Sequence, residues 1–117
     1  MDDLVQFLRD RLDEDERIAK ACAGNGQWNA DDIEIYGKEL APEVRAHMAT
    51  HDPARALAEV AAKKRILDFY DAAHSDAVRN AVGIDSQDGT ISAATAAVRC
   101  LATVYADHPD YNEAWRP

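Results

Sequence analysis

The stretch from His51 to Gly83 constrains the fold most, because it has the sequence of one long helix. Asp52 is a good helix cap, since its carboxylate can accept bonds from the free amides of a first turn. Pro53 follows at the first helical position, where its missing N–H costs nothing. Apolar side chains then recur three or four positions apart, without Gly or Pro before Gly83. The pattern predicts an amphipathic helix of more than average length, on which the other elements pack.

Two more apolar seams predict two more long helices. Residues 2–23 carry an apolar stripe and end at Gly24, a natural left-handed cap. The stripe consists of Leu4, Val5, Leu8, Leu12, Ala19 and Cys22. After a polar turn at 84–89, a helix capped by Thr90 or Ser92 is expected to stop before Pro109. Its seam consists of Ile91, Ala94, Val98, Leu101 and Tyr105. Small neighbouring side chains should let this helix approach the long one closely.

The segment near 28–36 is ambiguous. Trp28, Ile33, Ile35 and Tyr36 alternate enough for a short β-hairpin, whereas Asn29 could instead cap a short helix. We favour the hairpin, because Ile-x-Ile-Tyr-Gly is typical of strands and a glycine would fit badly inside a helix. Another short helix is expected over 43–50. The predicted fold is therefore a mainly α single domain over 1–117, a bundle of three or four helices with a short hairpin near 28–36.

Composition narrows the classes of function. The chain has 117 residues, a net charge of −9 and a hydrophobic fraction of 47%, which suit one small folded domain. Residues 1–50 hold twelve acids against six bases. This charge disfavours direct nucleic-acid binding, because that affinity comes mainly from Lys and Arg. No run approaches the ~18 apolar residues of a membrane span, and the start lacks a signal-peptide pattern, so we expect no membrane association and a cytoplasmic location.

Two histidines form the only spacing typical of a metal site. His47 and His51 stand four apart, which places both imidazoles on one face of a helix. Zinc enzymes with this spacing have a glutamate after the first histidine, but Met48 stands there. Packing or capping roles are therefore the favoured interpretation, and a zinc site is the alternative. The third ligand would have to be an acid or one of four other side chains: Cys22, His74, Cys100 or His108.

Two segments are candidates for protein contacts. The acidic run Asp13, Glu14, Asp15 and Glu16 cannot converge on one ion, because consecutive helical residues point about 100° apart. It is expected to form a solvated acidic face. Near the C-terminal end, Tyr111 and Trp115 could fold back on the domain, which we favour, or remain exposed as anchors for a partner. We predict no catalytic residue and no cofactor site, since no nucleophile or phosphate-loop motif is present.

Three segments carry a resemblance to a known family. They are Met1–Leu8 with Leu12–Glu16, His51–Arg55 continuing through Ala62–Leu67, and Tyr105–Tyr111 with Trp115–Pro117. Together they resemble a family of small uncharacterised proteins from actinobacteria and their phages. The resemblance brings no established activity. It implies a cytoplasmic accessory protein, encoded by a phage in some cases.

Three classes of function follow from these observations. The favoured one is an acidic accessory module that acts by binding another protein, in a sharper form as a mimic of nucleic acid. The second is a zinc-binding domain or enzyme built on His47 and His51. The third is a structural subunit that associates with copies of itself.

Overall fold

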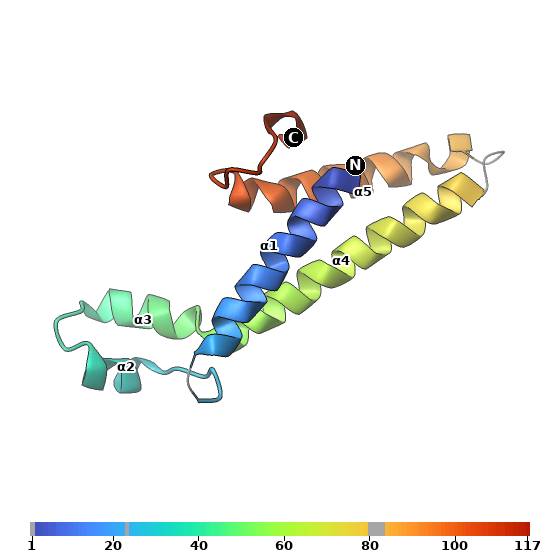
Figure 1. Cartoon of the computed structure of the whole chain (residues 1–117). Coiled ribbons are helices and arrows are strands. Elements are labelled where there is room, and N and C mark those ends of the chain that lie inside the picture. The colour runs from blue at the N-terminus through green and yellow to red at the C-terminus, as the bar shows by residue number, and fades with distance from the viewer. Residues whose placement is uncertain (1, 23, 80–83) are drawn as a thin grey trace. The chain divides into compact units, whose positions relative to one another are not determined.

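The computed structural model describes residues 2–22, 24–79 and 84–117 (Figure 1). These residues form five α-helices and two short 3-10 helices and contain no strand, which confirms the mainly α fold class. The elements are α1 (Asp2–Ala21), α2 (Ala30–Tyr36), α3 (Pro42–Thr50), α4 (Pro53–Arg79), α5 (Ile84–Ala102), η2 (Thr103–Tyr105) and η3 (Glu113–Trp115). None of the helices in this described part is long and apolar enough to cross a membrane.

The predicted hairpin near 28–36 is wrong, because α2 occupies this segment. The side chain of Asn29 caps α2 by accepting a bond from the Asp32 amide at 2.8 Å. Gly37 follows the last helical residue, and its N–H donates to the Ile33 carbonyl at 2.8 Å. The glycine therefore ends the helix and does not interrupt it. Local capping outweighed the strand preference of the isoleucines.

The start of α4 agrees with the sequence prediction. Asp52 accepts a bond from the Arg55 amide at 2.8 Å, and Pro53 is the first helical residue. The same carboxylate accepts a bond from the Trp28 amide at 3.1 Å. Gly26 adds a second link, since its carbonyl accepts from the Ala54 amide at 2.9 Å. The segment before α2 is thus fastened to the start of α4.

The polar turn predicted at 84–89 is wrong, because α5 begins at Ile84. A single glycine inside a helix costs only about 1 kcal/mol relative to alanine. The helix that continues to Ala102 is rich in alanine, so it can tolerate Gly89. The predicted end of the long helix near 80–83 lies outside the described residues.

The chain divides into two compact units. Unit 1 comprises Met1–Leu12 and Ala62–Pro117, and unit 2 comprises Asp13–Ala61. The buried apolar side chains described in unit 1 are Leu4, Val5, Phe7, Leu8, Leu12, Leu67, Tyr70, Val98 and Ala102. Those described in unit 2 are Ala19, Ile33, Pro53 and Val60. The expectation of a single domain over 1–117 stays a prediction.

Candidate functional site

The α2–α3 excursion (residues 29–51) is the part of unit 2 between the end of α1 and the start of α4. Ile33 is its one buried side chain among those described. The two ends of the excursion are held together by the bonds from Trp28 to Asp52 and from Ala54 to Gly26. Any Cβ on Gly26 would come 3.1 Å from the Ala54 amide nitrogen, and its φ of +77° also favours glycine. The base of the excursion is therefore a specified, closely packed feature.

Apolar side chains of the excursion face solvent. Every residue of α3 is described and none is buried. Ile35 on α2 is 66% exposed and Val44 on α3 is 44% exposed, while Trp28 at the base is 37% exposed. Short helices draw most of their stability from tertiary packing. Side chains as exposed as Ile35 and Val44 add little to the packing of the two short helices.

Acidic side chains surround these apolar residues in sequence. Residues 30–50 contain five acids and two bases, and unit 2 as a whole contains eleven acids and five bases. The predicted acidic run belongs to this unit. Glu14 pairs with Arg17 and Glu16 pairs with Lys20, both along α1. The run is therefore partly neutralised within its own helix, as expected for a solvated face.

His47 and His51 lie near each other, as their spacing indicates. The ring centroids are 4.5 Å apart, with His47 in the last turn of α3 and His51 at its C-cap. Both side chains are exposed. Across the described residues, no three His, Cys, Asp or Glu side chains gather in a way that could hold a metal ion. The pair supplies two imidazoles, fewer than the three protein ligands that a zinc site usually has.

The aromatic residues near the C-terminal end pack against Phe7 of α1. The Phe7 ring centroid lies 5.1 Å from that of Trp115 and 6.0 Å from that of Tyr111. His108 and Tyr105 approach the same ring at 5.6 and 6.3 Å. Edge-to-face aromatic pairs of this kind contribute about 0.5–1.5 kcal/mol beyond the area they bury. The predicted fold-back of Tyr111 and Trp115 is confirmed within unit 1.

Arg11 joins this aromatic cluster through its guanidinium. The group lies 5.6 Å from the Phe7 ring centroid and contacts Nε2 of His108. The Asp110 amide donates to Nδ1 of His108 at 3.0 Å. The Nε of Arg11 and the hydroxyl of Tyr111 are buried without a hydrogen-bond partner in the described part of the chain. The cluster holds the C-terminal segment on α1.

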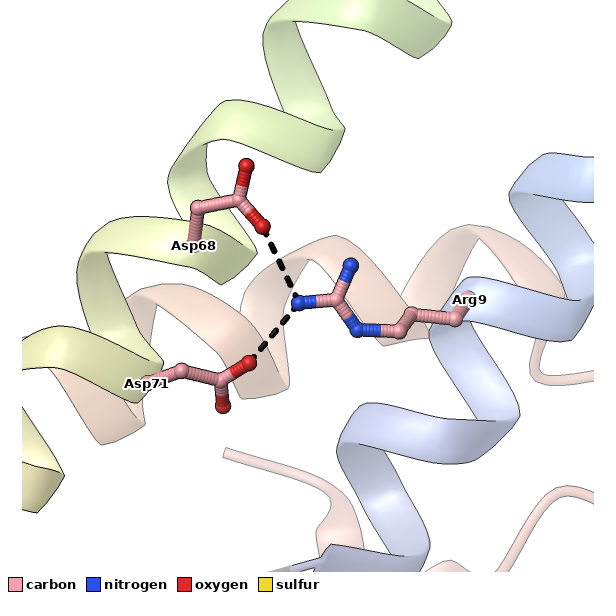
Figure 2. A network of polar contacts seen from close by, with 3 residues as sticks. All are labelled: Arg9, Asp68 and Asp71. Carbon is pink, nitrogen blue, oxygen red and sulfur yellow. Dashed lines mark hydrogen bonds and ion pairs between the residues drawn. The ribbon is translucent and has the colours of Figure 1, made fainter.

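Arg9 links α1 to α4 inside unit 1, as Figure 2 shows. Its Nη2 donates to Asp71 at 2.7 Å and to Asp68 at 3.2 Å. The hydrogen bond that Arg9 donates to Asp71, supported by the one to Asp68, raises the pKa of Arg9, and burial opposes this rise. Since all three side chains remain partly exposed, the network orients two helices and adds little to stability.

Comparison with known proteins gives one match. The model of a family of unknown function, DUF6221, matches residues 1–117. The chain belongs to DUF6221. No curated protein and no solved structure matches it. The uncharacterised family expected from the sequence is thereby confirmed at this level, and DUF6221 carries no activity to transfer.

The sequence prediction for this DUF6221 chain missed two central residues. The apolar pattern of residues 2–23 does not single out Phe7, yet four aromatic contacts of the C-terminal segment share its ring. Arg11 lies four positions later, on the same helical face. The four-residue spacing of Phe7 and Arg11 was the available signal for this cluster, together with the fact that the only bases among the first sixteen residues are arginines.

Proposed function

We propose that the protein is a non-enzymatic protein-interaction module, a small helical bundle whose α2–α3 excursion docks on another protein. The observation that carries this proposal is that α3 buries none of its residues while Ile35 and Val44 stay exposed. A helix of nine residues is marginal in water without packing. A partner surface would add to the packing that α3 has against α2.

The charge of the excursion indicates the chemistry of that partner. Five acids against two bases in residues 30–50 favour a surface with an apolar centre and Lys or Arg at its rim. The acidic run Asp13–Glu16 extends this character along unit 2, so salt should weaken the association by screening. Its ion pairs to Arg17 and Lys20 favour a general attraction over a single specific contact.

The resemblance of three segments supports a cytoplasmic accessory role and an origin in actinobacteria or their phages. Tyr111 and Trp115 are half-buried, so only the exposed parts of their rings would contact a partner. The partner is a protein, because the acidic charge opposes direct contact with nucleic acid or anionic membranes.

Affinity capture with surface variants tests the proposal. Ile35→Asp and Val44→Asp place a charge in the apolar centre, and both sites are exposed enough for the fold to tolerate it. The immobilised protein should retain one defined host protein from the lysate of its natural host, and each variant should lose it. Raising the salt concentration should also reduce the retained amount.

Phe69→Asp is the matched control, because Phe69 is 66% exposed but belongs to α4 in unit 1. The control should retain the same host protein as the unchanged chain. Loss of binding in all three variants, or in none of them, would refute the excursion as the docking surface. Circular dichroism of each variant distinguishes lost contact from lost helix.

A second proposal concerns zinc, since the His47 and His51 rings lie close together. The missing ligands would have to come from a binding partner or from water. Elemental analysis of the purified protein, alone and with a captured partner, tests this. Zinc at less than one ion per complex, unchanged by His47→Ala, would remove it.

Self-association is the third proposal, because two copies could cover each other's excursions. Sedimentation at several concentrations tests it against the monomer mass of 12.9 kDa. A monomer at all concentrations would remove this class and leave a different protein as the partner.

A further inference from the structure

A groove in unit 1 lies between α5 and the end of the described chain. It is an open groove of about 430 Å³ and is lined by Ser92, Thr95, Ala96, Arg99 and Pro117. The volume falls in the range of small-molecule sites. Positions 92, 95 and 99 are three and four apart, so they share one face of α5. Three residues that carry two hydroxyls and one guanidinium therefore line the same groove.

The guanidinium of Arg99 is the unusual group in this groove. Its Nε is buried and has no hydrogen-bond partner among the residues that the structure describes. A buried donor of a charged group without a partner costs free energy, so it calls for a ligand or an ordered water. Arg9, Arg17, Arg55 and Arg116 all bind carboxylates instead. Arg99 thus lines the groove and has one buried donor, Nε, without a partner in the described part of the chain.

We infer that this groove binds an oxyanion, the carboxylate or phosphate group of a small ligand. The guanidinium fork matches such groups with two parallel charge-assisted bonds. The hydroxyls of Ser92 and Thr95 can donate to the remaining oxygens. Ala96 and Pro117 offer apolar contact to a short carbon body beside the anion.

The net charge of the chain restricts the size of that ligand. A net charge of −9 repels extended polyanions, whereas a single anionic group is attracted by the local guanidinium. The site therefore selects a small molecule and not a nucleic acid. It is independent of the proposed docking surface, because α5 belongs to unit 1 and the α2–α3 excursion to unit 2.

Titration followed by NMR tests this inference on the full chain. The Nε–H of Arg99 gives its own ¹⁵N–¹H signal, and burial protects that proton from exchange with solvent. Inorganic phosphate and benzoate are added separately at constant ionic strength, with chloride as the reference. We expect a saturable shift of the Arg99 Nε–H signal and of the α5 amides near it with at least one of the two probes. The probe that binds more tightly distinguishes a phosphate from a carboxylate ligand. No saturable shift with either probe at tens of millimolar would overturn the inference.

Charge-matched variants then separate a built site from general attraction. Arg99→Gln should weaken binding about tenfold or more, as expected for charge-assisted bonds. Arg99→Lys should recover part of this loss, because it restores the charge but not the fork. Arg65→Gln removes the same charge from an exposed side chain of unit 1 and should leave binding unchanged. Equal weakening by Arg65→Gln and Arg99→Gln would overturn the site.

Thr95→Val covers the case in which Arg99→Gln does not fold. It keeps the guanidinium and the shape of the side chain and removes one donor. Weaker binding of the preferred probe, with an unchanged melting temperature of the free protein, supports the site. Unchanged binding by both Thr95→Val and Arg99→Lys overturns it.

Discussion

Unit 1 and unit 2 bury apolar surface very differently. Among the described residues, nine buried apolar side chains belong to unit 1 and four to unit 2. Leu4, Leu67 and Val98 of unit 1 are fully buried, whereas α3 of unit 2 buries nothing. Since buried apolar area is the main source of stability, unit 1 should provide most of the stability of this protein. Unit 2 is organised mainly by helix caps and by hydrogen bonds at the base of its excursion.

Charge follows the same division. Unit 2 contains eleven acids and five bases, and unit 1 contains eleven acids and eight bases. The unit with the thinner core is also the more acidic one. A stable domain gains nothing from this combination, because like charges repel and little apolar area offsets the repulsion. A surface that docks on a basic partner gains attraction from it, which is how the comparison supports the proposed function.

Phe7→Ala should have the largest effect, because it removes the ring on which four aromatic side chains pack. We expect unit 1 to lose about 3–5 kcal/mol of unfolding free energy, the usual cost of truncating a buried phenylalanine. Trp115 lies 5.1 Å from Phe7 and reports the loss by fluorescence in a Trp28→Phe background. Its emission should shift to longer wavelength before global unfolding.

Phe69→Ala provides the matched control for this truncation. Phe69 is an exposed phenylalanine of the same unit, so the change should stay within about 0.5 kcal/mol. Equal destabilisation by the two truncations would contradict the assignment of the main core to the Phe7 side of unit 1.

Ile33→Ala tests the thinner core of unit 2. Ile33 is only 9% exposed, so we expect the unfolding free energy to fall by about 2 kcal/mol, the low end for such truncations. Ile35→Ala on the same helix should cost much less, because that side chain is 66% exposed. Amide hydrogen exchange resolves the two units: Ile33→Ala should speed exchange in α2 and α3 and leave α5 unchanged. Faster exchange throughout the chain would mean that the units unfold together.

The long helices could be predicted from sequence because their signals are redundant. Asp52, Pro53 and the seam through Leu67 and Tyr70 all indicate one helix, and the structure confirms each of them. The segment near 28–36 had competing signals. The β-branched Ile33 and Ile35 favoured a strand, whereas the cap at Asn29 favoured a helix and decided the structure.

Contacts between segments far apart in sequence were not predictable from patterns. The aromatic residues of the C-terminal segment indicated packing, but nothing in their spacing named Phe7 as the partner. Arg99 had no signal at all, since an arginine in the last turn of a helix usually complements the helix dipole. The proposed role of Arg99 depends on a buried Nε without a partner among the described residues, and a sequence pattern cannot show this.

Arg9→Gln tests whether ion pairs add to the stability of unit 1. The Arg9 bonds to Asp68 and Asp71 join partly exposed groups, so we expect a loss below about 1 kcal/mol. Denaturant unfolding at low and high salt measures the effect, which should shrink as salt rises. Arg65→Gln, with the same charge change on an exposed side chain, should show no such salt dependence. A loss of several kcal/mol that salt leaves unchanged would show that Arg9 acts as a packing residue.

Asp52→Asn should have the smallest effect, one that is present at neutral pH and disappears at acid pH. Bonds from the Arg55 and Trp28 amides hold the pKa of Asp52 below its ordinary value of 3.8. A carboxyl with a lowered pKa stabilises the folded state above its unfolded pKa, and this stability is lost as the pH falls through the folded pKa. Asparagine keeps the cap but not the charge. The unfolding midpoints of the two proteins should therefore differ by a constant amount at neutral pH and converge below about pH 4, near the ordinary pKa of aspartate.

Glu39→Gln, which removes a charge from an exposed side chain of unit 2, provides the comparison. Because Asp52 closes the base of the α2–α3 excursion, the acid loss should appear in Trp28 fluorescence and not in that of Trp115. Convergence seen equally at both tryptophans would mean that the carboxylate stabilises the chain as a whole, and the separate stability of the two units would have to be abandoned.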